Sequence, residues 1–248
     1  MRTRALAGSL LTILSLAMAE SAYSDFSIGT INVDFNGSVS PSATALDTGV
    51  IGSTGDAWNV IAGTPSGAQS LNFTTGGASG VALQLAGSFS TGTSGGANGP
   101  NSTLTQDFLA VSGATPNTGT LILAGLTVGQ QYALYLYNGS TSIGRITDFS
   151  VTGTATVSGS VNNIGTPGVV LWTPATAIVP GNYVQLNGTA NAGGQLVIQF
   201  MNRAASEGDF AGFQIRAIPE PSTYALLVTG AAALLIVAYR ARRRSSAK

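Results

Sequence analysis

The chain has no cysteine and no histidine among its 248 residues, and only 8% of the residues are charged. The absence of cysteine excludes disulfides and thiol nucleophiles. The absence of histidine excludes serine triads with a histidine base, histidine general acid catalysis and metal sites with imidazole ligands. An enzyme made from this chain would therefore have to use carboxylates.

Charge is also distributed unevenly along the chain. The whole chain is formally neutral, but residues 20–218 contain three arginines and nine carboxylates, which gives a net charge of −6. A nucleic-acid-binding domain needs a basic patch, so we expect no nucleic-acid partner. With so few charges, the solubility of this part must depend largely on Ser, Thr, Asn and Gln.

The C-terminal region has the order of a membrane segment with a basic end. Residues 219–221 read Pro-Glu-Pro, the nineteen residues 221–239 carry no charge, and residues 240–248 contain four arginines and a lysine. At ~1.5 Å per residue this stretch reaches roughly 28 Å, close to the ~30 Å hydrocarbon core. Because it is apolar on all faces, we predict a single transmembrane helix at about 222–239 rather than a buried core helix. The positive-inside rule places residues 240–248 in the cytoplasm.

These features together resemble the PEP-CTERM sorting signal of Gram-negative bacteria that make extracellular polysaccharide. The resemblance covers residues 218–248. It implies that Pro219, Glu220 and Pro221 are the recognition motif for an exosortase, an integral-membrane, transpeptidase-like enzyme that removes the tail. It also implies a protein that is exported across the inner membrane, anchored there transiently and then placed at the cell surface or in the extracellular matrix.

The N-terminal region has the pattern of a signal peptide. Arg2 and Arg4 precede an apolar run that ends with Ala17-Met18-Ala19, the small residues that signal peptidase requires. We therefore predict that residues 1–19 are removed, with Ala22 as an alternative cleavage point. A transmembrane anchor is disfavoured because the run is shorter than the ~20 residues of a usual span. The exported domain is then expected at residues 20–217.

The central region has the pattern of an all-β domain. Short segments rich in Val, Ile, Leu, Tyr and Phe recur between clusters of Gly, Asn, Ser, Thr and Pro, with no long helical period. This number of strands in about 200 residues favours a single jelly-roll-like β-sandwich over a seven-stranded immunoglobulin unit. One helical turn is expected at 103–110. Strands are predicted at 26–35, 69–73, 80–86, 120–124, 131–137, 145–151, 168–172, 182–186, 195–201 and 212–217.

A local motif supports the sandwich. Residues 126–132, which end in Tyr132, resemble the turn before a tyrosine-bearing strand in fibronectin-type and jelly-roll domains, where the tyrosine hydroxyl bonds back to the turn. Residues 31–35, 49–59, 126–137 and 210–215 together resemble galactose-binding-like jelly-roll modules of exported bacterial proteins. That resemblance implies a carbohydrate-binding style of fold without assigning a sugar.

The best candidate for a carbohydrate-binding loop is the segment Gly55-Asp56-Ala57-Trp58-Asn59. A sugar packs its CH face on an aromatic ring and directs its hydroxyls to polar partners. Asp56, Trp58 and Asn59 are therefore candidate binding residues. The alternative is that Trp58, like Trp172, fills the sandwich core.

Metal and catalytic sites have less support in the sequence. Glu207 and Asp209 lie two positions apart in an expected loop before the last strand. With Asp34 or Asp56 they would supply oxygen ligands for calcium, although no EF-hand loop is present. The alternative is a solvated or turn-capping role for these acids. No catalytic residue and no other cofactor is predicted.

Two classes of function follow. The first is a non-catalytic surface or matrix protein, associated with exopolysaccharide in a structural or carbohydrate-binding role. The second is a polysaccharide hydrolase or lyase that uses carboxylates. The lack of histidine and of an acid/base motif favours the first. A pair of carboxylates in a concave groove with Trp58 would favour the second.

Overall fold

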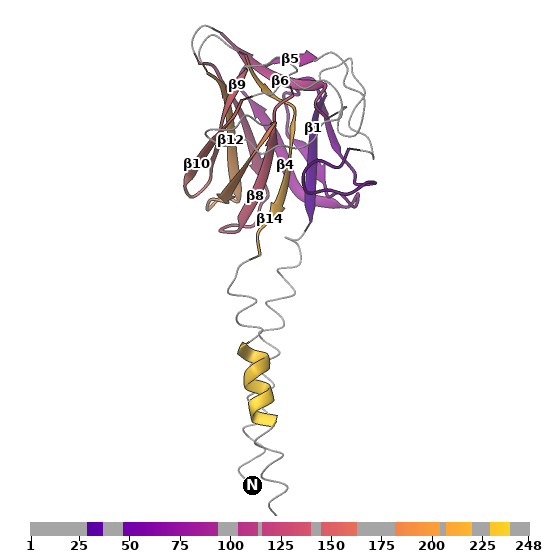
Figure 1. Ribbon diagram of the computed structural model, residues 1–248, viewed down its shortest axis with the longest axis vertical. Coiled ribbons are helices and arrows are strands. Elements are labelled where there is room, and N and C mark those ends of the chain that lie inside the picture. Colours follow the sequence, from indigo (N-terminus) through magenta and orange to yellow (C-terminus); the bar gives the residue numbers. More distant parts are fainter. Residues whose placement is uncertain are drawn as a thin grey trace, which may run out of the picture. The chain divides into compact units, whose positions relative to one another are not determined.

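The computed structural model describes residues 29–36, 47–93, 104–113, 116–139, 145–162, 182–203, 207–219 and 229–238. The chain divides into two compact units, residues 1–217 and residues 218–248. The first unit contains fourteen strands within the described ranges, arranged in two large sheets and one small sheet (Figure 1).

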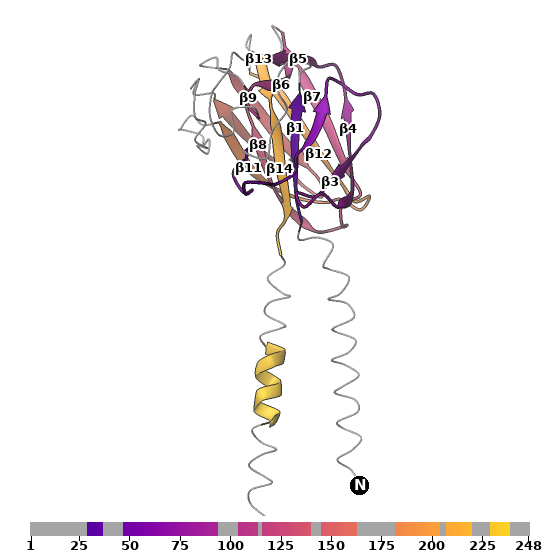
Figure 2. The same ribbon diagram turned by 90° about the vertical axis from the view of Figure 1, so that its right-hand side faces the viewer.

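The two large sheets form the layers of a sandwich. The five-stranded sheet has the order β11 (Tyr183–Thr189), β8 (Gln131–Tyr137), β14 (Gly212–Ala217), β1 (Thr30–Asn36) and β2 (Asn59–Ala62). The six-stranded sheet has the order β10 (Thr156–Asn162), β9 (Ile146–Thr152), β12 (Gln195–Asn202), β7 (Thr118–Ala124), β4 (Ala78–Ala86) and β3 (Gln69–Asn72). A small sheet lies at one end of the sandwich and contains β13 (Glu207–Phe210), β6 (Asp107–Ser112) and β5 (Ser90–Thr93) (Figure 2).

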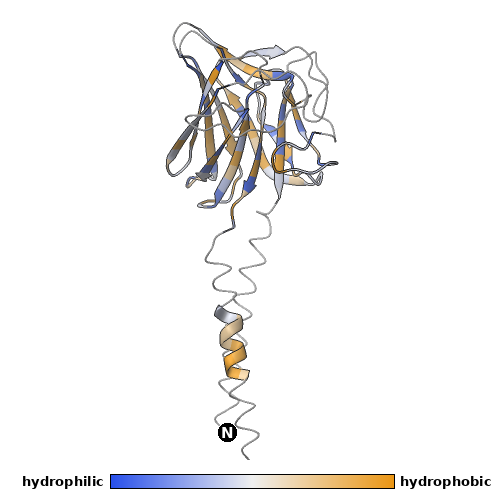
Figure 3. Cartoon of the chain, viewed as in Figure 1, coloured by the Kyte–Doolittle hydropathy of each residue, from blue (hydrophilic) through white to orange (hydrophobic). Residues whose placement is uncertain are grey.

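Alternation along strands such as β7, β9 and β12 builds the core between the layers (Figure 3). In β12, Leu196, Ile198 and Phe200 are buried, while the residues between them are half-buried. This is the period of two that places one set of side chains inside and the other outside.

The centre of the core is aromatic. The ring centroid of Phe210, from the small sheet, lies 5.1 Å from that of Phe35, 5.0 Å from that of Phe149 and 5.4 Å from that of Phe200. These rings come from both layers, so Phe210 joins the two large sheets where the small one meets them. The predicted all-β, jelly-roll-like sandwich is confirmed.

The strand predictions succeed where alternation is visible. The segments 131–137 and 212–217 coincide with β8 and β14 residue for residue, and the predicted segment 168–172, with Trp172, lies outside the described residues. The helical turn expected at 103–110 is wrong, because Asp107–Ser112 is the strand β6. Five of its six residues are buried, so both of its faces are covered and no alternation is visible in its sequence. Glu207 and Asp209 likewise lie on a strand, β13, and not in a loop.

The second unit contains a helix at residues 229–238 (Figure 3). All residues of this helix are exposed. Within the described residues, no helix has the length and apolarity needed to cross a membrane. Residues 222–228 and 239 of the predicted span 222–239 lie outside the described residues, as do Glu220, Pro221, the basic end and the signal peptide at 1–19. The transmembrane helix and the signal peptide therefore stay predictions.

Candidate functional site

The candidate loop lies on the outer face of the five-stranded sheet, held there by one buried glutamine. Gln214 projects outward from β14, opposite to the core-facing Phe213 and Ile215, yet it is fully buried. Its Oε1 accepts hydrogen bonds from the backbone N–H of Val50, at 2.8 Å, and of Ile51, at 3.1 Å. Its Nε2 donates to the carbonyl of Thr48, at 3.1 Å.

The same glutamine is bonded to two side chains of the sheet. Its Nε2 donates to Asn32 Oδ1 at 2.9 Å, and its Oε1 accepts a bond from the Tyr137 hydroxyl. The Tyr137 hydroxyl also accepts a bond from Val50 N–H at 3.0 Å. Burial raises the pKa of Tyr137 well above its ordinary value, so this hydroxyl keeps the proton that it donates. The loop that starts at Asp47 is thus fixed to the sheet by a network of buried polar groups.

The three predicted binding residues have different roles in this loop. The Asp56 carboxylate accepts a bond from Ser53 N–H at 2.8 Å and closes a turn. Trp58 is half-buried, and its Nε1 donates to the carbonyl of Asp47 at 2.7 Å. Asn59 bridges backbone groups, because its Nδ2 donates to the carbonyls of Asn32 and Asn72.

These contacts assign Asp56 and Asn59 to the structure of the loop. In each case at least one polar atom of the side chain is already hydrogen-bonded to backbone. Trp58 is different, since its indole N–H is bonded while its ring remains partly accessible. Of the three residues, Trp58 is therefore the one that still offers an apolar surface to a ligand.

A group of aromatic and polar side chains on the same outer face was not predicted. The ring of Tyr183 lies 6.3 Å from that of Tyr135 and 6.2 Å from that of Tyr137, measured between centroids. The guanidinium of the exposed Arg216 lies 5.9 Å from the Tyr135 ring centroid, within the range of a cation–π contact. Its Nη2 also donates to the Tyr135 hydroxyl at 3.3 Å. We call Tyr135, Tyr183 and Arg216 the tyrosine–arginine patch.

The sequence contained a signal for this patch. Leu134-Tyr135-Leu136-Tyr137 alternates, so both tyrosines share one face of β8 and both leucines share the other. Because both sets are large and apolar, the pattern did not reveal which face is the outer one. The structure decides it, since both leucines belong to the core cluster.

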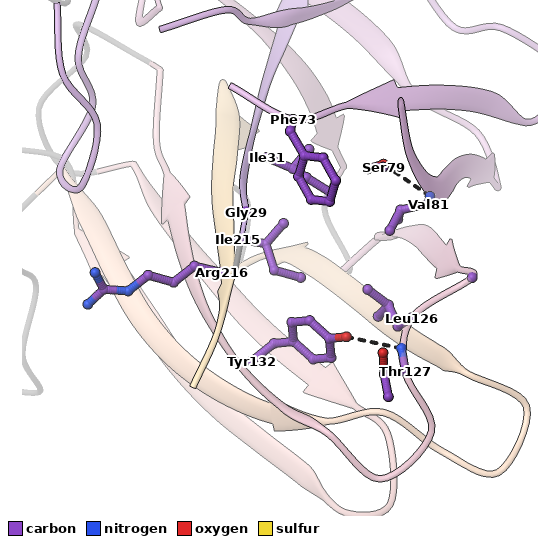
Figure 4. Close-up of a pocket in the computed structure, with 11 residues that line it drawn as sticks. Gly29, Ile31, Phe73, Ser79, Val81, Leu126, Thr127, Tyr132, Ile215 and Arg216 are labelled. Atoms are coloured by element: carbon purple, nitrogen blue, oxygen red, sulfur yellow. Dashed lines mark hydrogen bonds between the residues drawn. The ribbon is translucent and has the colours of Figure 1, made fainter. Parts of the chain in front are cut away.

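A hollow at the opposite end of the sandwich from the small sheet has an apolar lining (Figure 4). Its side chains include Ile31, Phe73 and Ile215, while Arg216 points away from it. The Tyr132 hydroxyl accepts a bond from Thr127 N–H at 3.0 Å, which confirms the predicted bond from this tyrosine back to its turn. Among the described residues that line this hollow, none is a carboxylate.

Glu207 and Asp209 form an ion cluster with Arg145. Arg145 Nη1 lies 3.2 Å from Glu207 Oε1 and 3.2 Å from Asp209 Oδ2. Burial raises the pKa of Asp209 to about 7, although Arg145 opposes the rise, and the nearby Glu207 carboxylate adds to it. The guanidinium lies where a cation shared by these two acids would bind. In the part of the chain that the structure describes, no group of three or more acidic side chains is placed to hold a metal ion.

Comparison with known families concerns the second unit. Residues 217–244 match the model of the PEP-CTERM protein-sorting motif. The chain carries a PEP-CTERM sorting motif. Such a motif implies an exported surface protein that is processed by an exosortase. A search of curated proteins gave no match to the chain.

Comparison with solved structures concerns the sandwich. One similar structure is TmCBM61 in complex with beta-1,4-galactotriose, at 10% identity, with 55% of this chain and 88% of that chain covered and a TM-score of 0.30. Another is the Clostridium thermocellum xylanase 10B CBM22-1-GH10 modules complexed with xylohexaose, at 11% identity, 56% and 26% coverage and a TM-score of 0.30. A third is the Bacteriophage CBA120 tailspike protein 4, at 14% identity, 56% and 19% coverage and a TM-score of 0.29. The chain spans about a quarter or less of the xylanase and tailspike chains, and likeness at these scores carries no argument about function.

Proposed function

We propose that this protein is an exported, non-catalytic surface protein whose β-sandwich associates with polysaccharide through the outer face of the five-stranded sheet. The observation that carries the proposal is the tyrosine–arginine patch. There, the half-buried ring of Tyr183 and the exposed guanidinium of Arg216 flank Tyr135. Such a mixture suits a sugar, whose CH face packs on a ring while its hydroxyls take polar partners.

Further side chains on this face extend the same chemistry. Gln185 and Asn187 are exposed and lie on β11, on the same side as Tyr183. Trp58 precedes β2, at the opposite edge of the sheet. Five strands at ~4.8 Å spacing separate these edges by roughly 19 Å, which suits an extended chain of several sugars better than a single sugar.

Export and sorting complete the proposal. Signal peptidase would remove residues 1–19, and the chain would remain in the inner membrane through residues 222–239 until the exosortase acts at Pro219-Glu220-Pro221. The match of residues 217–244 to the sorting motif supports the second step. The sandwich would then stay at the cell surface or in the extracellular matrix, among the polysaccharides that it binds.

Affinity electrophoresis tests the binding step. The full-length chain in detergent is run through gels that contain galactan, xylan, dextran or polygalacturonate. We expect retardation by at least one of these polymers and a loss of about tenfold in affinity for Tyr183→Ala. Gln84→Ala is the matched control, since Gln84 is an exposed residue of β4 on the other sheet. Equal retardation of the Tyr183 variant and the unmodified chain would contradict the assignment of the site.

Mass spectrometry of the envelope fraction tests the sorting step. Replacement Glu220→Ala should leave a membrane-retained precursor with its arginine-rich tail intact. The physical reason is that the apolar segment is unchanged while the motif beside it is altered. Normal trimming of this variant would show that Glu220 is not required for sorting.

The alternative of a carboxylate-based hydrolase or lyase has less support. It requires two acids that face one cleft, about 5 Å or 6.5–9.5 Å apart. Among the described residues, those that line the apolar hollow of Figure 4 include no acid, and those that line the groove over the six-stranded sheet include one, Asp148. Glu207 and Asp209 are adjacent, but both are bound to Arg145.

A further inference from the structure

The outer face of the six-stranded sheet contains a groove that the proposed function does not use. It has a volume of about 400 Å³ and lies over β7, β12, β9 and β10. This volume falls within the ~300–1,000 Å³ that is typical of small-molecule sites. The side chains that give it its character are Thr118, Asp148, Ser150, Ser158, Gln199 and Met201.

A fixed carboxylate lies in the groove. Asp148 Oδ2 accepts a bond from Arg203 Nε at 3.0 Å, and its Oδ1 is bonded to Arg203 Nη2 and to the Ser160 hydroxyl. These bonds to Arg203 and Ser160 lower the pKa of Asp148 although partial burial acts to raise it. The carboxylate is therefore ionised and held in place. Two carboxylate oxygens offer about four lone-pair sites, so a further hydroxyl donor is accommodated.

Around this carboxylate lie polar side chains that are available to a ligand. Within the described ranges, the side chains of Ser150, Ser158 and Gln199 make no hydrogen bond, and each is exposed or half-buried. Hydroxyl and amide groups both donate and accept. Met201 adds a flexible apolar side chain that adapts to the shape of its partner.

The charge of the groove selects the class of ligand. The carboxylate of Asp148 is neutralised by Arg203, and the remaining lining residues are uncharged. Among the described residues that line the groove there is no cation to attract a nucleotide or an acidic polymer. A neutral ligand rich in hydroxyls would find an acceptor in Asp148 and both donors and acceptors in Ser150, Ser158 and Gln199.

We propose that this groove binds a segment of neutral polysaccharide. It lies on the opposite outer face of the sandwich from the tyrosine–arginine patch, because the two large sheets enclose a common core. The existence of this groove site does not depend on the proposed function. The consequence of the groove site does rest on the proposed function. A domain with a sugar site on each face would hold two polysaccharide chains together and act as a cross-link.

Titration calorimetry counts the sites. The full-length chain in detergent is titrated with neutral hexasaccharides of galactan, xylan and dextran, and we expect two sites per chain for at least one of them. The double variant Ser150→Ala/Gln199→Ala should lose one site, and Tyr183→Ala should lose the other. Ser158→Glu, at an exposed position of β10, blocks the groove without altering a buried residue and should match the double variant. Gln84→Ala, on the same outer face but outside the groove lining, should keep both sites.

The outcomes separate the two proposals. If the groove variants keep every site that the unmodified chain has, the inference is overturned while the proposed function stands. If a site is lost in the groove variants and none is lost in Tyr183→Ala, the inference stands and the tyrosine–arginine patch is excluded. No binding of any hexasaccharide would overturn both. Circular dichroism of each variant confirms that the β-sandwich is retained.

Discussion

The two outer faces of the sandwich differ in what covers them. Gln214 and Gln199 are the same residue type, and both project outward from a strand of a large sheet. Gln214 is fully buried beneath the loop that starts at Asp47 and bonds to its backbone, whereas Gln199 is half-buried in an open groove. A polar residue on the outer side of a strand is therefore structural, or available to a ligand, according to the segment that packs over it.

Replacement of the two glutamines is the strongest test of this difference. Gln214→Ala should lower the free energy of unfolding by about 3 kcal/mol, because several buried partners lose their bonds together. Gln199→Ala should change it by less than about 0.5 kcal/mol, as is usual for accessible sites. Urea denaturation of both variants measures the two values. Similar losses for both would refute the contrast between a covered face and an open one.

The small sheet at one end of the sandwich should give the next largest effect, a dependence of stability on pH. The pKa of Asp209 is about 7 in the folded chain, against about 3.9 in an unfolded one. As the pH rises from 4 to 7, the unfolded chain therefore loses this proton before the folded chain does. Stability from this group is complete below pH 4 and is lost as the pH approaches 7, by an amount on the order of 2 kcal/mol.

Denaturant unfolding between pH 4 and pH 7 measures this dependence. Asp209→Asn should flatten the decline, since an amide does not ionise. Ser90→Ala, at an exposed position of β5 in the same small sheet, should keep the slope of the unmodified chain. A variant Asp209→Asn with an unchanged slope would mean that another group titrates.

Replacement of Trp58 tests whether its ring stabilises the loop that covers the five-stranded sheet or binds sugar. Because the ring is half-buried and its N–H is bonded to Asp47, Trp58→Ala should cost about 1–2 kcal/mol, less than the ~3–5 kcal/mol of a buried aromatic residue. If the ring also contacts sugar, the affinity should fall about tenfold, which equals about 1.4 kcal/mol. Thermal melts and affinity electrophoresis separate the two losses. A larger loss of stability with unchanged affinity would assign Trp58 to the core.

The smallest effect is expected from the exposed ion pair on the open face. Bonds to Arg203 lower the pKa of Asp148, so its contribution to stability is present above pH 4 and is lost as the pH falls below that value. Arg203 is 53% exposed, and such pairs contribute little. Arg203→Ala should therefore change the unfolding midpoint in urea only slightly at pH 7, and by less at pH 3 than at pH 7. A large change at both values would indicate that Arg203 packs structurally.

The sequence by itself determined two things: the presence of a C-terminal sorting motif and the all-β class of the fold. The sorting motif at the C-terminus is a contiguous segment that is defined by the order of its proline, apolar and arginine residues. It can therefore be identified from the sequence without knowledge of the fold. Strands β8 and β14 were predicted residue for residue because their sequences alternate: Leu alternates with Tyr in β8, and Phe213 and Ile215 alternate with Gln214 and Arg216 in β14. The Tyr132 bond to its turn was expected from the resemblance of residues 126–132 to tyrosine-bearing turns, a motif that is local because its two partners lie five positions apart.

Only the tertiary structure showed which side chains on the outer faces of the two large sheets are covered and which are accessible. β6 is buried on both sides and β10 is rich in Ser and Gly, so neither has a strand-like alternation of apolar residues. Gln214 bonds to Val50, 164 positions away, and Asp148 bonds to Arg203, 55 positions away. No local pattern records such pairs, because they arise only when the sheets close around their core. The availability of a polar side chain depends on that closure, and for this reason the two candidate sugar sites were found from the folded chain.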